Sequence, residues 1–110
     1  MPAVAKVKLV AEKLRTLVQR AQPRDLFDLR LYLVESGWYL DAADLRRAVD
    51  AKLALTRHRR WRSGLWRLNL EAIERAWDET MGSWVDPSRL APVTTAIEDV
   101  ARRLRELRLD

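Results

Sequence analysis

The chain has 110 residues, with 21 lysines and arginines against 16 aspartates and glutamates, a net charge of +5, no cysteine and one histidine. A chain of this length builds one core, so we expect a single domain, residues 1–110. The missing cysteines exclude disulfide scaffolds, iron–sulfur clusters and thiol nucleophiles, and the lone His58 excludes histidine-rich metal sites. No apolar run approaches the roughly 20 residues that span a bilayer, and no signal-peptide pattern is present, so we expect a cytoplasmic protein without membrane contact.

The composition predicts an all-α fold, because Leu, Ala, Arg and Glu dominate and no segment alternates β-branched with polar residues. We expect a compact bundle of about five helices that opens with an antiparallel helical hairpin. Apolar spacing, prolines, glycines and capping residues predict helices over residues 4–21, 24–35, 42–53 with an extension as far as 64, 68–80 and 92–107, and a single turn at Asp86-Pro87.

The tryptophans fall into two groups. Trp38, Trp77 and Trp84 lie at or beside apolar stripes and are predicted to be in the core. Trp61 and Trp66 lie in a basic segment, and if the third helix ends near residue 64 they cover an exposed groove instead.

Positive charge is concentrated in residues 57–68, where five basic side chains occur without an acidic one. Arginines interleaved with indoles suit a phosphate backbone with unstacked bases. This pattern predicts contact with RNA, by charge more than by sequence, through Arg57, Arg59, Arg60, Trp61 and Arg62. A solvated basic helix end that complements the helix dipole explains the pattern equally well. His58, flanked by arginines, is predicted to be solvated or capping and not a metal ligand.

Four charged residues are expected to meet in one notch between the first two helices. Lys13 and Arg20 lie seven residues apart on one side of the first helix, and Asp25 and Asp28 lie three apart near the start of the second. Only Gln22-Pro23 separates the helices, so they return as a hairpin. A lysine can neutralise phosphate charge and a carboxylate can orient a metal, a base or that lysine, as phosphoryl transfer requires. Plain salt bridges between adjacent helices are the competing interpretation.

Residues 12–29 follow the pattern E-K-L-x-x-L-x-x-R-x-x-x-R-D-L-x-D-L. In this pattern the chain resembles the helical C-terminal region of the AbiEii/AbiGii-type nucleotidyltransferase toxins, the toxin halves of type IV toxin–antitoxin and abortive-infection systems. The resemblance implies that Lys13 contacts the phosphates of a nucleotide and that Asp28, with Asp25 as the lesser candidate, is the catalytic acid or base. Arg20 shares the helix side of Lys13 and is a second candidate for the phosphates.

The resembling family also has a polymerase-β-like sheet whose G-S-x-x-x-x-D-x-D motif holds Mg²⁺, which implies Mg²⁺ and a nucleoside triphosphate as cofactors. Only twelve residues precede Lys13, and the segment Gly82-Ser83-Trp84-Val85-Asp86 has the wrong gap, so no metal ligands are predicted here. We expect half of an enzyme, inactive alone, completed by a second polypeptide that carries the motif. An antitoxin and an RNA are further candidate partners. The alternatives are a non-catalytic helical RNA-binding or regulatory module and a degenerate remnant of a toxin gene.

Overall fold

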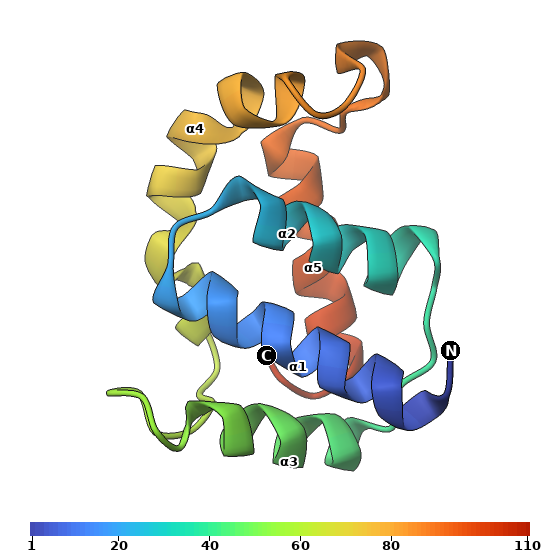
Figure 1. The fold of residues 1–110 in the computed structure, drawn as a ribbon, viewed down its shortest axis with the longest axis vertical. Helices are drawn as coiled ribbons and strands as arrows, with labels where there is room; N and C mark the ends of the chain where they lie inside the picture. The colour runs from blue at the N-terminus through green and yellow to red at the C-terminus, as the bar shows by residue number, and fades with distance from the viewer.

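The computed structural model describes all residues from Met1 to Asp110 and confirms an all-α fold without strands. The helices and short helical segments are α1 (Ala3–Gln19), α2 (Pro23–Arg30), η1 (Leu31–Glu35), α3 (Ala42–Leu53), η2 (Leu65–Asn69), α4 (Leu70–Gly82), η3 (Pro87–Arg89) and α5 (Val93–Glu106). Figure 1 shows α2 and α3 on opposite sides of α1, with α5 crossing behind the hairpin and α4 along one edge. No helix has the length and apolarity needed to cross a membrane.

The opening hairpin confirms the prediction of two antiparallel helices. Gln22 is extended and Pro23 occupies the first position of α2, where its fixed φ and missing N–H are no disadvantage. The helix continues into η1, a π-helical turn in which the Ser36 N–H donates to the Leu31 carbonyl at 2.8 Å. Gly37 follows with φ +58°, a left-handed conformation that glycine adopts without steric cost, so the helical path ends there.

The third helix begins as predicted, because the Asp41 carboxylate accepts a hydrogen bond from the Asp44 N–H at 2.9 Å. Its longer extent, as far as residue 64, is wrong: α3 ends at Leu53. Beyond that point the side chain of Leu55 is 98% exposed, so no apolar stripe continues the helix. The Thr56 side chain closes the end of α3 by donating to the Leu53 carbonyl and accepting from the His58 N–H.

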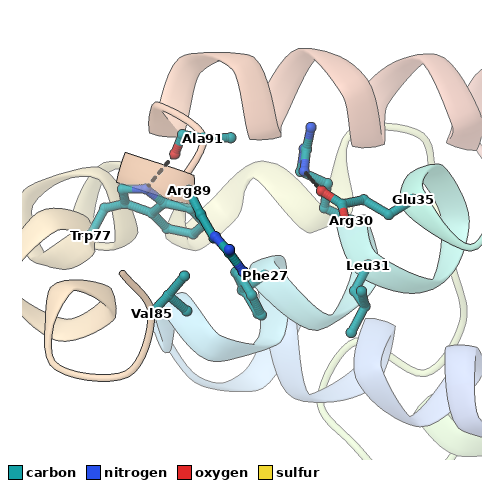
Figure 2. A pocket seen from close by; sticks show the side chains of 8 residues that line it. All are labelled: Phe27, Arg30, Leu31, Glu35, Trp77, Val85, Arg89 and Ala91. Atoms are coloured by element: carbon teal, nitrogen blue, oxygen red, sulfur yellow. Dashed lines mark hydrogen bonds and ion pairs between the residues drawn. The ribbon is translucent and has the colours of Figure 1, made fainter. Parts of the chain in front are cut away.

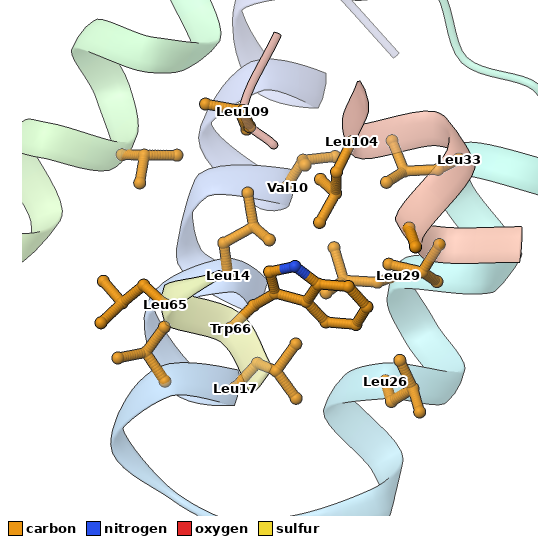
Figure 3. Packing of buried hydrophobic residues seen from close by; sticks show 14 of the residues in the cluster. Val10, Leu14, Leu17, Leu26, Leu29, Leu33, Leu65, Trp66, Leu104 and Leu109 are labelled. Carbon is orange, nitrogen blue, oxygen red and sulfur yellow. The ribbon is translucent and has the colours of Figure 1, made fainter. Parts of the chain in front are cut away.

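Trp66 lies at the centre of the core, surrounded by leucines of α1, α2 and α5 (Figure 3). Trp61 is also buried, so the expectation that Trp61 and Trp66 cover an exposed groove is wrong. Trp77 is buried in the core, as predicted. The prediction that Trp84 lies in the core is also wrong, because Trp84 is 66% exposed in the loop after α4. Trp38 is partly buried and packs against the core as predicted.

Candidate functional site

Lys13, Arg20, Asp25 and Asp28 come together between α1 and the first turns of α2, and we call them the hairpin cluster. Lys13 Nζ lies 2.7 Å from Asp28 Oδ2 and 3.7 Å from Asp25 Oδ1. Arg20 Nε and Nη2 donate to the two carboxylate oxygens of Asp25 at 3.0 and 3.2 Å. The fork of a guanidinium matches a carboxylate in this way and fixes its orientation. The predicted juxtaposition of these four side chains is therefore present.

Burial separates the members of the hairpin cluster into two kinds. The Asp25 side chain has no exposed surface, whereas those of Lys13 and Asp28 are 19% and 24% exposed. The hydrogen bond and charge of Asp25 raise the pKa of Arg20 above its ordinary value. Two cations and two carboxylates leave the cluster with no net charge. Lys13 and Asp28 can therefore meet a ligand from water, while Asp25 can act only through its two cationic neighbours.

A second ionic group flanks the cluster on the side of α1 that faces α3. Lys52 Nζ of α3 lies 3.1 Å from Glu12 Oε2, and Arg15 also pairs with Glu12. The Arg15 hydrogen bond outweighs the opposing effect of burial and, together with Lys52, lowers the pKa of Glu12 to about 2. Glu12 thus stays ionised and joins α1 to α3 beside the hairpin cluster.

The carboxylates of the hairpin cluster do not fit a Mg²⁺ site. Both oxygens of Asp25 accept from Arg20, and the nearest cation to Asp28 is the Lys13 ammonium. Magnesium prefers oxygen ligands in octahedral geometry and is poorly placed beside an ammonium group. Across residues 1–110 no group of three His, Cys, Asp or Glu side chains could hold a metal ion. The Asp86 side chain accepts from the Ser88 N–H at 3.0 Å, so it caps η3 as expected of that segment.

The structure also contains a cavity of about 170 Å³ between α2, α4 and residues 85–91 (Figure 2). Phe27 and Trp77 contribute aromatic surface to it, and Arg30 and Arg89 are its cationic residues. Sequence reasoning missed this cavity because its walls come from segments far apart in the chain. No residue of the hairpin cluster lines it, so it is separate from the predicted site.

The predicted nucleic-acid-binding residues lie in an irregular segment, residues 54–64, which we call the arginine loop. Arg57, Arg59, Arg60 and Arg62 are all exposed. Trp61 is 1% exposed, and its Nε1 donates to the Leu109 carbonyl at 2.5 Å. The expectation that Trp61 contacts nucleic acid is corrected, because a buried indole offers no face on which a base could stack.

His58 lies inside the arginine loop and is partly buried. Burial, followed by the charges of Arg57 and Arg62, lowers the pKa of His58 below its ordinary value. Its backbone N–H donates to Thr56 Oγ1 at 3.2 Å, next to the end of α3. Arg57 Nε also donates to His58 Nε2 at 3.5 Å, and Arg62 Nη1 donates to the His58 carbonyl at 3.2 Å, so both arginines lie against this residue.

Comparison with known proteins identifies a matching family. The family model described as "Nucleotidyl transferase AbiEii toxin, Type IV TA system" matches residues 1–104. The match therefore includes the motif at residues 12–29 and covers α1 to α4 and most of α5. No curated protein and no solved structure matches the chain.

Proposed function

The chain belongs to the AbiEii family of nucleotidyltransferase toxins of type IV toxin–antitoxin systems, and from this premise we propose that it supplies the helical, nucleotide-facing part of a nucleotidyltransferase site. In this proposal Lys13 contacts the phosphates of a nucleoside triphosphate and Asp28 is the catalytic acid or base. Arg20 assists Lys13 at the phosphates. An antitoxin is the partner expected from the family.

The observation that supports this proposal most directly is that the Lys13 ammonium lies close to one carboxylate and farther from a second, and is partly exposed. One carboxylate oxygen lies at 2.7 Å and another at 3.7 Å, and the side chain is 19% exposed. A lysine ammonium has three donors, so at least one N–H remains for an incoming phosphate oxygen. An ammonium held in place before the ligand arrives stabilises developing phosphate charge without reorganisation.

Asp25 has a different part in this proposal. Its carboxylate is fully buried and lies between Arg20 and Lys13, so we assign it as a positioning residue that orients both cations. Asp28 is partly exposed and lies on the same side of α2, where it can reach a proton on the substrate.

The divalent metal that the family implies finds no ligand set in residues 1–110. We therefore propose that the G-S-x-x-x-x-D-x-D carboxylates and their Mg²⁺ are supplied from outside residues 1–110. Residues 1–110 alone then transfer no nucleotide, because the metal is the main source of charge stabilisation in this chemistry.

The competing interpretation is that the cluster only clamps the hairpin, since every member already has a partner. A comparable ion pair elsewhere in the chain serves as a control that distinguishes a ligand-binding role of the cluster from a purely structural one. Arg30 Nε of α2 lies 3.2 Å from Asp99 Oδ2 of α5, and the two side chains are 21% and 17% exposed, close to the values for Lys13 and Asp28. Lys13→Ala and Asp99→Asn should therefore have similar effects on stability but different effects on nucleotide binding.

The test measures triphosphate binding to residues 1–110 by ³¹P NMR, and transfer after a chain carrying G-S-x-x-x-x-D-x-D is added. We expect Lys13→Ala to weaken binding and to lower restored transfer by about 10²–10³-fold. Asp28→Ala should lower transfer by about 10²–10⁴-fold with little change in binding. Asp99→Asn should leave both unchanged. Equal losses in all three variants would identify the cluster as a structural clamp.

A further inference from the structure

The arginine loop holds cations that lack anionic partners. Thirteen ion pairs occur in the structure, and none includes Arg57, Arg59, Arg60 or Arg62. Arginines on the helices find acids one turn away, as in Arg47–Asp44 and Arg75–Glu71. Residues 51–70 contain no acid at all, so the loop has no local source of negative charge.

Two acidic residues, Asp50 and Asp110, contact the loop and its flanking residues, and they accept hydrogen bonds from backbone N–H groups, a hydroxyl and an indole. Asp50 Oδ1 accepts from the Trp61 N–H at 2.7 Å. Asp110 accepts from Ser63 Oγ, the Gly64 N–H and Trp66 Nε1 at 3.0, 2.7 and 3.0 Å. Burial alone would raise the pKa of Asp110, but these hydrogen bonds lower it below its ordinary value. Their negative charge fixes the loop and leaves its exposed guanidinium groups without a carboxylate partner, although Arg57 and Arg62 donate to His58 Nε2 and the His58 carbonyl.

The loop is therefore fastened along its second half. The Trp61 indole is inserted into the core and bonded to the Leu109 carbonyl, and Trp66 lies at the core centre just beyond Gly64. A fixed backbone reduces the entropy lost when a ligand binds. We infer that the arginine loop is a docking surface for the phosphate backbone of a nucleic-acid duplex, and that it binds the duplex by charge and not by base sequence. This inference goes beyond the proposed function, because the loop and the hairpin cluster share no residue.

Burial of Trp61 and Trp66 determines which polyanion is favoured. Single-stranded nucleic acid is bound through aromatic faces on which bases stack, and the loop presents none. Charge density then decides among ligands. A duplex carries one negative charge per about 1.7 Å of axis, whereas an extended acidic peptide carries one per about 3.3–3.6 Å. Guanidinium groups also bind phosphate oxygens in a bidentate manner.

Fluorescence anisotropy tests the inference with a 20-base-pair RNA duplex, one of its strands alone, and poly-L-glutamate, each between 50 and 200 mM KCl. We expect the duplex to bind most tightly, and the slope of log K against log salt to approach about −3.6 for four phosphate contacts. Arg59→Gln/Arg60→Gln/Arg62→Gln should reduce that slope by about 2.7. The matched control is Arg47→Gln/Arg75→Gln/Arg102→Gln, which removes the same charge from exposed helix positions and should keep the slope.

His58 gives a second measurement, because it is the only histidine in the chain and its ring protons can be followed by NMR. Bound phosphates should offset the charges of Arg57 and Arg62, so the pKa of His58 should rise when the duplex is added. Lys13→Ala should retain duplex binding, so that failure of the proposed function is distinguishable from failure of this inference.

Three results would overturn the inference. Tighter binding of the single strand would indicate base stacking, and binding of poly-L-glutamate as tight as that of the duplex would indicate an acidic protein partner. Equal slopes for the two triple variants would mean that overall charge, and not the loop, attracts the duplex. If the glutamine variant fails to fold, the corresponding triple lysine variant replaces it and should keep the full slope.

Discussion

Cationic side chains are neutralised in the hairpin cluster and lack carboxylate partners in the arginine loop. In the cluster, two cations face two carboxylates across a helix pair, and a fully buried Asp25 fixes their positions. In the loop, four arginines face water without a carboxylate within 4.0 Å, and the nearby acids bind backbone and indole N–H groups instead. Removing a charge from the cluster should therefore leave a carboxylate without its cation, whereas removing a charge from the loop leaves no carboxylate behind. The following substitutions separate the two roles.

The largest effect is expected for Arg20→Ala. It leaves the Asp25 carboxylate fully buried with only Lys13, 3.7 Å away, as a cation. Arg20 itself is 57% exposed, so the pair is only half-buried, and leaving the buried carboxylate without its hydrogen-bond donor costs about 1–3 kcal/mol. Urea unfolding at pH 7 measures this loss, with Arg75→Ala, from an exposed pair on α4, as the control that should change stability by less than about 0.5 kcal/mol. Equal losses would show that Asp25 does not depend on Arg20.

Trp61→Phe should have an intermediate effect, because it keeps an aromatic ring in the core but removes the donor to the Leu109 carbonyl. A buried carbonyl without its hydrogen bond costs about 1–2 kcal/mol. Amide hydrogen exchange in residues 57–62 should also become faster as the loop loosens. The control is Trp84→Phe, whose indole is 66% exposed, and exchange in the loop should not respond to it. Unchanged exchange in both variants would contradict the anchoring role of Trp61.

The effect of Glu12→Gln should be smaller and dependent on pH. Because the pKa of Glu12 is lowered from 4.5 to about 2 in the folded chain, its ionised form adds stability above pH 4.5 and loses it as the pH falls toward 2. The difference between wild type and Glu12→Gln should be less than about 1 kcal/mol at pH 6 and should shrink between pH 4.5 and 2. Urea titrations across this range provide the test, and a constant difference would contradict the lowered pKa.

The smallest effect on stability is expected in the arginine loop. Arg59→Gln/Arg60→Gln/Arg62→Gln breaks no ion pair, so the free energy of unfolding should change by less than about 0.5 kcal/mol. The pKa of His58 should rise at the same time, because Arg62 is one of the charges that lower it. NMR titration of His58 checks the shift. The single bond lost is the exposed one from Arg62 to the His58 carbonyl, and a clear loss of stability would mean that it contributes more than an exposed hydrogen bond should.

The helices and the hairpin cluster could be predicted because both depend on short spacings. Pro23 and Gly37 begin and end the second helical segment. The first helix ends at Gln19, two residues before its predicted end, so Arg20 lies in extended backbone just past α1 and reaches Asp25 from there because the turn to Pro23 is short. Such features are fixed within a few turns of chain. The family match at residues 1–104 extends the motif-based resemblance over nearly the whole chain.

The positions of the tryptophans could not be predicted, because their burial depends on distant partners. Trp61 finds its acceptor 48 residues away, at the Leu109 carbonyl, and no local pattern indicates that contact. Trp84 follows an apolar stripe but lies past the end of α4, where it meets Arg24 at 4.8 Å and otherwise faces water. The end of α3 could not be predicted either, because a basic run is compatible with both a helix and a loop.

The arginine loop depends on residues 109 and 110, which are synthesised after all the helices. They accept the hydrogen bonds of Trp61, Gly64 and Trp66, so the loop cannot be fastened while those two residues are still inside the ribosome. The four residues of the hairpin cluster all lie in the first third of the chain, so they leave the ribosome long before residues 109 and 110 do. The last hydrogen bonds of the arginine loop can therefore form only when synthesis of residues 1–110 is complete, well after the cluster residues have emerged.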